Sequence, residues 1–322
     1  MVMGSLVFTA AIVTLAATVP DTSATFNPAE TRAEIDRLVR ASGADVAVAF
    51  RTLDGRDELL IQPDTAFHAA STMKVPVMIE LFRQARAGLL QLDDRVPVVN
   101  AFHSIVDDSP YTLDTSDDSD ADVARHIGGD MSYRELCDAM ITVSSNFAAN
   151  LIIEHLGAKN IQRTTDALGA GGMRVLRGVE DTKAFNAGLN NTTTARALMT
   201  LLGAIAGGRA VDAQASGEMI AILERQRFKD RIPAGLPAGT IVAHKTGEIT
   251  KIQHDAAIVY APQPFVLVIL VRGLEDPKKG AALAAQITRV LYRASQNAAD
   301  PKGPALRKRP VRTAFTEAAA VR

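Results

Sequence analysis

A serine followed three residues later by a lysine, in Ser71-Thr72-Met73-Lys74, has the residue types and spacing of a catalytic nucleophile and its partner. A hydroxyl must lose its proton to attack a carbonyl carbon, and a lysine one helical turn away is well placed to help. Apolar residues flank the motif on both sides and predict burial, so the lysine must be neutral or paired. Taken alone, the motif also fits a helix N-cap followed by a solvated lysine.

Two further polar clusters have residue types that could act together with Ser71 and Lys74. Ser144-Ser145-Asn146 lies in residues 140–156, a stretch of helix-like apolar spacing, where a helix N-cap at Ser144 or Ser145 is the alternative. His244-Lys245-Thr246-Gly247 follows an apolar run expected to be a strand, with the motif at its end. It supplies a cation, a hydroxyl and a glycine whose backbone a substrate can approach closely.

The elements expected to position these clusters come from both ends of the chain. Residues 46–51 and 58–61 read as two strands joined through Asp54-Gly55, a pair suited to a tight hairpin. Three more apolar, β-branched runs lie at 240–244, 256–260 and 265–271, and residues 280–295 have helical spacing. A helix precedes the first strand, with Asn27 as N-cap, Pro28 at its first position and Gly43 at its end. The expected fold is α/β (α+β), with an antiparallel sheet built from both termini and helices packed on it.

Between these strands the chain is mainly helical, which predicts an inserted all-α lobe. We expect an α/β lobe of residues 25–70 and 226–295 and a helical lobe of residues 71–225, forming one catalytic domain over 25–295. A cleft between the lobes is the natural place for a site. Residues 1–24 are expected to be a signal peptide, although no Lys or Arg precedes their apolar core. Residues 296–322 are expected to be a disordered basic tail.

Composition excludes several function classes. The chain has 322 residues, 47% hydrophobic and 22% charged, with a net charge of -1, so neither nucleic acid nor an acidic membrane surface is an implied partner. A small substrate fits better, and we expect a periplasmic or secreted monomer with no stable membrane span after processing. The single cysteine, Cys137, lies in an apolar helical stretch and is expected to be inert packing. No cofactor is implied, and no metal either, because the six histidines lack zinc-type spacing.

The three clusters, in their order and separation, resemble the S-x-x-K, S-D-N and K-T-G motifs of class A β-lactamases and penicillin-binding proteins. The resemblance covers nearly all of residues 27–295. It implies that Ser71 forms an acyl-enzyme, that Lys74 is its proton acceptor or electrostatic partner, and that Ser144 relays the proton to the leaving nitrogen. Asn146 would hold the substrate's side-chain amide.

The remaining implied roles concern the third motif, Lys245-Thr246-Gly247, and its surroundings. Lys245 and Thr246 would bind the substrate carboxylate, and the backbone N–H groups of Ser71 and Glu248 would form an oxyanion hole. Arg231 falls where some family members keep an arginine for the same carboxylate, and a simple surface arginine is the alternative.

The sequence departs from the family pattern at two places. Ser145 replaces the aspartate of the second motif, from which we expect altered packing of the helical lobe rather than lost chemistry. In the omega loop Glu180 is the candidate base for the deacylating water, but the expected asparagine four residues later is Ala184, and Asn186 is the candidate substitute. The alternative is that Glu180 only pairs with Arg177 or Lys183.

The expected activity is that of a class A serine β-lactamase, a hydrolase acting on cyclic amides, with a small β-lactam as substrate. If Glu180 does not position water, the same Ser71 machinery could serve a D-alanyl-D-alanine carboxypeptidase or an esterase. A non-hydrolytic penicillin-binding module is the third alternative.

Overall fold

The computed structural model describes residues 26–116, 118 and 121–297. The expected signal peptide, residues 1–24, lies outside the described residues. The expected tail, residues 296–322, also lies outside them, apart from residues 296–297, which end the last helix. Within the described part of the chain, no helix has the length and apolar character needed to span a membrane.

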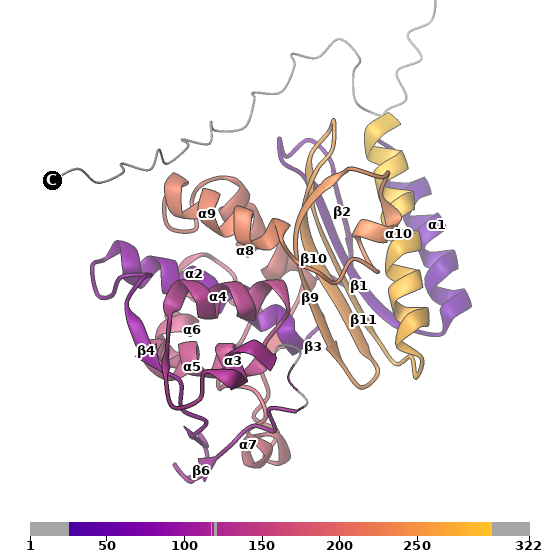
Figure 1. Ribbon diagram of the computed structural model, residues 1–322. Coiled ribbons are helices and arrows are strands. Elements are labelled where there is room, and N and C mark those ends of the chain that lie inside the picture. Colours follow the sequence, from indigo (N-terminus) through magenta and orange to yellow (C-terminus); the bar gives the residue numbers. More distant parts are fainter. Residues whose placement is uncertain (1–25, 117, 119–120, 298–322) are drawn as a thin grey trace, which may run out of the picture.

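One five-stranded antiparallel sheet forms the middle of the molecule, in the order β2-β1-β11-β10-β9 (Figure 1). Its strands are β1 (Asp45–Thr52), β2 (Glu58–Ile61), β9 (Ile241–Ile249), β10 (Ile252–Tyr260) and β11 (Phe265–Arg272). Val48 of β1 pairs with Ile61 of β2 on one side and with Ile269 of β11 on the other. The first strands and the last strands therefore share one sheet, which confirms the predicted fold class.

Two terminal helices cover one face of this sheet, α1 (Pro28–Ser42) and α10 (Pro277–Asn297) (Figure 1). The Asn27 side chain accepts a hydrogen bond from the Glu30 N–H, Pro28 occupies the first turn, and Gly43 ends α1 at φ 71°. Ile35, Phe50, Leu267 and Ile287 are fully buried between these helices and the sheet. This core makes the sheet a rigid support for β9, which lies at its edge.

The other face of the sheet meets the helices contributed by the middle of the chain. They are α2 (Lys74–Arg86), α3 (Ala121–Arg125), α4 (Tyr133–Thr142), α5 (Asn146–Leu156), α6 (Ala158–Ala167), α7 (Thr182–Asn186), α8 (Ala195–Ala206) and α9 (Ala213–Glu224). Helix α8 packs directly on β1, β10 and β11. Two 3₁₀ turns, η1 (Ala70–Met73) and η2 (Pro233–Gly235), join helices to the sheet.

Three pairs of short strands connect these helices. They are β3 (Phe67–His68) with β8 (Thr192–Thr193), β4 (Arg95–Pro97) with β7 (Asp130–Ser132), and β5 (Phe102–His103) with β6 (Pro110–Tyr111). The β3–β8 pair lies directly before η1, so it fixes the segment that enters the first motif.

Helix α2 is more deeply buried than an amphipathic helix. Every residue from Lys74 to Phe82 is buried, including Glu80, whose carboxylate accepts hydrogen bonds from Arg83, Gln84 and Thr164. The burial predicted from the apolar flanks is therefore confirmed, and neighbouring helices enclose this segment of α2. A helix so enclosed holds its first turn in one position.

Strand β9 is longer than predicted, which changes the place of the third motif. The strand continues to Ile249, so Lys245, Thr246 and Gly247 lie within it rather than at its end. Its partner β10 starts at Ile252 instead of 256, because buried polar residues break the apolar run there while still pairing in the sheet. The third motif is therefore held by backbone pairing along its whole length.

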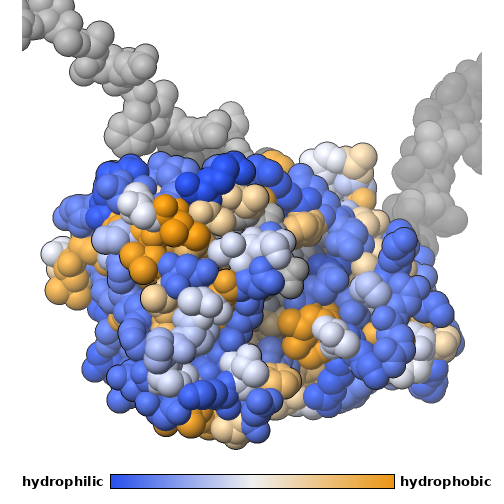
Figure 2. Space-filling model, turned by 60° about the horizontal axis from the view of Figure 1, so that its bottom comes forward, coloured by the Kyte–Doolittle hydropathy of each residue, from blue (hydrophilic) through white to orange (hydrophobic). Residues whose placement is uncertain are grey.

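Several large hydrophobic side chains are exposed on the surface. Leu89, Val99, Ile127, Phe185 and Phe228 are all more than a third exposed and come from different elements. Figure 2 shows a mostly hydrophilic face with hydrophobic residues in a few groups.

Candidate active site

Ser71 lies in η1, the turn that leads from β3 into α2. The residue before it, Ala70, has φ 46°, and its N–H donates to Nδ1 of His68 at 3.1 Å. Ser71 is partly exposed and lines two cavities, of about 460 Å³ and about 670 Å³. The smaller cavity contains Glu180 and the larger one Ser144, Arg231 and Thr246.

Lys74 begins α2 one turn after Ser71, and its side chain is fully buried. Its ammonium nitrogen donates to the Ser144 carbonyl oxygen at 2.6 Å, to Asn146 Oδ1 at 2.8 Å and to Ser144 Oγ at 3.3 Å. Burial lowers the pKa of Lys74 to about 7, and the carboxylates of Asp118 and Glu180 oppose part of that shift. Near neutral pH this amine therefore exists in both protonation states.

Ser144 joins the first motif to the third. Lys245 Nζ donates to Ser144 Oγ at 2.9 Å and to the Thr246 carbonyl oxygen at 2.8 Å. Lys245 is also fully buried, and burial together with the nearby Lys74 cation holds its pKa well below the usual value. The three polar clusters that the sequence places far apart thus meet at a single hydroxyl.

Backbone strain is concentrated here. Ala70, Ser144 and Glu180 all have positive φ, at 46°, 64° and 63°, a region that residues with a Cβ rarely adopt. Each borders the two cavities or lies in them. Such conformations cost free energy and persist where the surrounding structure holds a side chain in a required position.

Gly247 is required by a close approach of backbone to backbone. A Cβ at this position would lie 3.0 Å from Cγ2 of Thr72, 3.2 Å from its backbone nitrogen and 3.3 Å from the Ala69 carbonyl oxygen. The sequence suggested that a substrate approaches this glycine, whereas the structure shows that η1 does. The glycine lets β9 lie directly against the turn that carries Ser71.

Ser145, which stands where the family motif has an aspartate, bonds to a carboxylate from a different segment of the chain. Ser145 is the N-cap of α5, accepting from the Ala148 N–H at 3.1 Å. Asp118 Oδ2 accepts from Ser145 Oγ at 3.1 Å and from the Phe147 N–H at 2.7 Å. The helix N-terminus next to Lys74 therefore still faces a negative charge.

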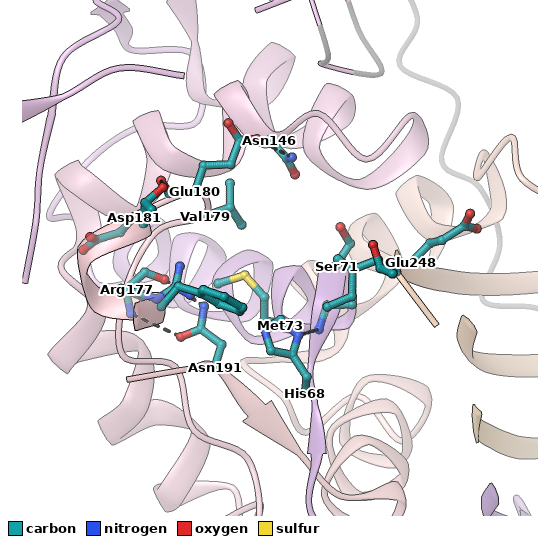
Figure 3. A pocket seen from close by; sticks show the side chains of 15 residues that line it. His68, Ser71, Met73, Asn146, Arg177, Val179, Glu180, Asp181, Asn191 and Glu248 are labelled. Atoms are coloured by element: carbon teal, nitrogen blue, oxygen red, sulfur yellow. Dashed lines mark hydrogen bonds between the residues drawn. The ribbon is translucent and has the colours of Figure 1, made fainter. Parts of the chain in front are cut away.

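Glu180 lies in the smaller cavity with Ser71. Its carboxylate accepts a hydrogen bond from Asn146 Nδ2 at 2.9 Å, and Asn146 in turn accepts one from Lys74. Figure 3 shows Glu180 and Asn146 beside each other, with Ser71 and Glu248 on another side of the cavity. Asn146 thus links the carboxylate to the buried ammonium.

The loop that carries Glu180 is held by buried amide and guanidinium groups. Asn150 Oδ1 accepts from the Val179 N–H at 2.7 Å, and its Nδ2 donates to the Val179 carbonyl oxygen at 3.0 Å. The Arg177 guanidinium donates to the carbonyl oxygens of Gly178 and Leu189, each at 2.9 Å. These bonds fix the backbone on the N-terminal side of Glu180.

Arg177 and Lys183, the two cations considered as alternative partners of Glu180, both bind other groups. Arg177 bonds carbonyl oxygens as described, and Lys183 pairs with Asp107 at 2.9 Å. Glu180 itself bonds Asn146, and its role in deacylation stays a prediction. Asn186 is exposed at the end of α7 and is not among the described residues that line the cavity, so the structure does not bring it to Glu180.

Arg231 is buried rather than a surface arginine, with its side chain 3% exposed. It lines the larger cavity with Ser71 and Thr246. Its guanidinium pairs with the carboxylate of Glu248, a contact that the sequence did not indicate.

Two other residues, His254 and Cys137, are buried in the protein. His254 is fully buried, bonded to the His68 carbonyl oxygen and the Val271 N–H, and burial lowers its pKa to about 4. Cys137 is buried, and burial raises the pKa of its thiol to about 12, which agrees with inert packing.

Sequence reasoning missed Asn150 and Asp118. Asn150 had a usable signal, since it is a polar residue one helical turn after Asn146 in an apolar stretch. Asp118 had none, because it contacts α5 from a segment 27 residues earlier.

Comparison with known proteins agrees with this geometry. A family model described as "Beta-lactamase enzyme family" matches residues 30–295. Among curated proteins, beta-lactamase AST-1 of Nocardia asteroides is 30% identical over 295 residues, covering 89% of this chain and 91% of the relative. A beta-lactamase of Bacillus licheniformis is 29% identical over 240 residues, covering 72% of this chain and 73% of the relative.

Among solved structures, a class A beta-lactamase from Mycobacterium abscessus has a TM-score of 0.70 at 26% identity, covering 82% of this chain and 98% of its own. PBP-A has a TM-score of 0.71 at 27% identity, covering 84% and 99%. A mutant of PBP-A was solved as an acyl-enzyme complex with penicillin G.

Proposed function

This chain belongs to the β-lactamase enzyme family, and from that premise we propose that it hydrolyses β-lactams through an acyl-enzyme formed on Ser71. The observation that carries the proposal is the convergence on Ser144 Oγ, with Lys245 Nζ at 2.9 Å and Lys74 Nζ at 3.3 Å, in a cavity that Ser71 also lines. This arrangement provides a nucleophile, a titrating amine and a proton relay in one place.

In acylation, the neutral form of Lys74 accepts the Ser71 proton as Oγ attacks the lactam carbonyl carbon. Its pKa of about 7 supplies that neutral form near neutral pH. Ser144 Oγ accepts hydrogen bonds from both lysines, so its own proton is directed elsewhere. We propose that it passes this proton to the departing lactam nitrogen and is reprotonated from Lys74.

The substrate carboxylate binds at the larger cavity, which Thr246 and Arg231 line, with Lys245 buried behind Ser144. The lactam carbonyl oxygen lies between the backbone N–H groups of Ser71 and Glu248, and each such donor contributes about 3–4 kcal/mol to lowering the barrier. The side-chain amide of the substrate contacts Asn146, which borders both cavities.

In deacylation, Glu180 activates a water molecule that attacks the ester carbon. Its place in the cavity beside Ser71 and its hydrogen bond to Asn146 at 2.9 Å support this role. Asn146 lines this cavity and Asn186 is not among the described residues that do, so we propose that Asn146 supplies the amide that helps to hold the water.

The proposal is tested with purified residues 25–322 and a chromogenic cephalosporin. We expect many turnovers per enzyme molecule, none with Ser71→Ala, and a stable mass increase of the intact protein with Glu180→Gln. A single burst without turnover by the unsubstituted protein contradicts hydrolysis as its function. Unchanged deacylation in Glu180→Gln contradicts the role of Glu180.

A second candidate function rests on the similarity to PBP-A, a protein solved with penicillin G bound covalently in mutant form. With the same Ser71 chemistry, the chain would act as a D-alanyl-D-alanine carboxypeptidase or esterase, or as a non-hydrolytic penicillin-binding module. Release of D-alanine from a D-Ala-D-Ala peptide, at a rate above β-lactam turnover, distinguishes this function.

We further propose that the protein acts as a monomer in the periplasm or outside the cell. Relatives named as beta-lactamases and the apolar run of residues 1–24 support export. N-terminal sequencing of the secreted protein and its elution volume in size-exclusion chromatography test both statements.

A further inference from the structure

The Glu248 carboxylate forms an ion pair with Arg231, the arginine proposed to bind the substrate carboxylate. The Arg231 guanidinium pairs with the Glu248 carboxylate, and both side chains line the larger cavity with Ser71, Ser144 and Thr246. The pair therefore lies inside the proposed substrate pocket and not beside it.

The two partners differ in their freedom to move. The Arg231 side chain is 3% exposed and that of Glu248 is 51% exposed. Arg231 is thus held by the protein, while Glu248 stands at the solvent side of β9 and borders both cavities. A pair with one exposed partner is held weakly enough for that partner to leave.

Arg231 needs an anion in the absence of substrate. A guanidinium remains charged at all relevant pH values, and a buried cation is costly unless paired. The carboxylate of Asp230 also lies near Arg231, but it is 3.9 Å away and 59% exposed. Nε of Arg231 is buried and has no hydrogen-bond partner among the described atoms, so the guanidinium has donor capacity left.

A substrate carboxylate is the same chemical group as the Glu248 side chain. Two carboxylates on one guanidinium repel each other, so Glu248 and a substrate carboxylate compete for Arg231. Lys245 and Thr246 are already positioned beside this place by the sheet and by Ser144.

We infer that Glu248 is a specificity-determining residue, an internal carboxylate that occupies Arg231 in the free enzyme and that a carboxylated β-lactam must displace. The inference rests on the proposed function and adds a competitor within its binding site. Its consequence is weaker binding of carboxylated substrates than the cations of the pocket alone would give.

The test measures binding separately from chemistry. In a Ser71→Ala background, dissociation constants are measured by calorimetry for benzylpenicillin and for its uncharged methyl ester. Glu248→Gln is expected to tighten benzylpenicillin binding about tenfold, equivalent to ~1.4 kcal/mol, and to change binding of the ester less than about twofold. Glu275→Gln is the matched control, since it removes the same charge from an exposed residue paired with Lys251. It is expected to leave both constants unchanged.

The outcomes are distinguishable. Weaker or equal binding of benzylpenicillin to Glu248→Gln overturns the inference and leaves the proposed function intact. Equal tightening of acid and ester also overturns it, because the effect is then steric. No binding of either ligand to any variant contradicts the proposed function and the inference with it. Glu248→Asp, which keeps the charge, is expected to bind as the parent does.

Discussion

The carboxylate of Asp118 is predicted to stabilise the N-terminus of α5 and to support the charge on Lys74. Asp118→Asn keeps the shape and removes the charge. Asp118 Oδ2 accepts from Ser145 Oγ at 3.1 Å and from the Phe147 N–H at 2.7 Å. A hydrogen bond to a charged group contributes ~1.5–3 kcal/mol, and a charge at a helix N-terminus ~0.3–1 kcal/mol.

Asp118 is partly exposed and asparagine retains one acceptor. We therefore expect the substitution to remove stability near the lower end of these two contributions added together. Asp118→Asn should lower the free energy of unfolding by about 1–2 kcal/mol, measured by urea denaturation at pH 7. The double variant Asp118→Asn with Ser145→Asp should recover most of the loss, since it returns a carboxylate to the cap of the same helix.

Asp114→Asn is the control, because Asp114 lies in the same segment but is exposed and, within the described part of the chain, bonds Ser116 alone. A change within about 0.5 kcal/mol is expected there. The reasoning is refuted if Asp118→Asn is as stable as the parent, or if Ser145→Asp adds nothing to the Asp118→Asn variant.

Three further predictions follow from the site. The rate of acylation, measured by intact-protein mass after rapid quenching, should rise with pH around a midpoint near 7, because Lys74 must be neutral to accept a proton. Since Asp118, like Glu180, favours the charged form of Lys74 while Lys245 opposes it, Asp118→Asn should move that midpoint to lower pH; a move upward contradicts the assignment. Ser144→Gly should be more stable to urea than Ser144→Ala by about 1 kcal/mol, because glycine adopts φ 64° freely, while both slow acylation; equal stabilities contradict the strain argument. Asn150→Ala should slow deacylation more than acylation, because it releases the backbone before Glu180, and the acyl-enzyme should accumulate in the mass spectrum; parallel loss of both steps indicates a general folding defect.

Local signals predicted the elements of this fold well. Asn27 and Gly43 bound the first helix, and Asp54-Gly55 joins the first two strands, because caps and turns depend on only a few neighbouring residues. The apolar pattern of the sequence did not predict the buried start of β10. The beginning of β10 was missed because Gln253 and Asp255 are polar yet buried, and their burial depends on partners from other elements.

The candidate site was predictable where a motif carried it and unpredictable where tertiary contacts did. Lys74 and Lys245 meet at Ser144 Oγ, and Ser71 lines the same cavity as Ser144, an arrangement that the family resemblance implied. The contact between Glu248 and Arg231 could not be predicted, because it depends on side-chain orientation across an edge strand. Such contacts are set by packing and not by sequence spacing.

The pairing of β1 with β11 determines when the sheet can form during synthesis of the chain. Asp45 of β1 bonds Arg272 of β11, 227 residues later, and every helix from α2 to α9 lies between them in sequence. A nascent chain therefore delivers these helices before the sheet has its final three strands. Closing so long a loop is entropically costly and slow, so the sheet forms after the ribosome has finished nearly the whole polypeptide. The turn bearing Ser71 gains its β9 neighbour only at that last stage, and a chain interrupted before residue 241 has a nucleophile without its third cluster.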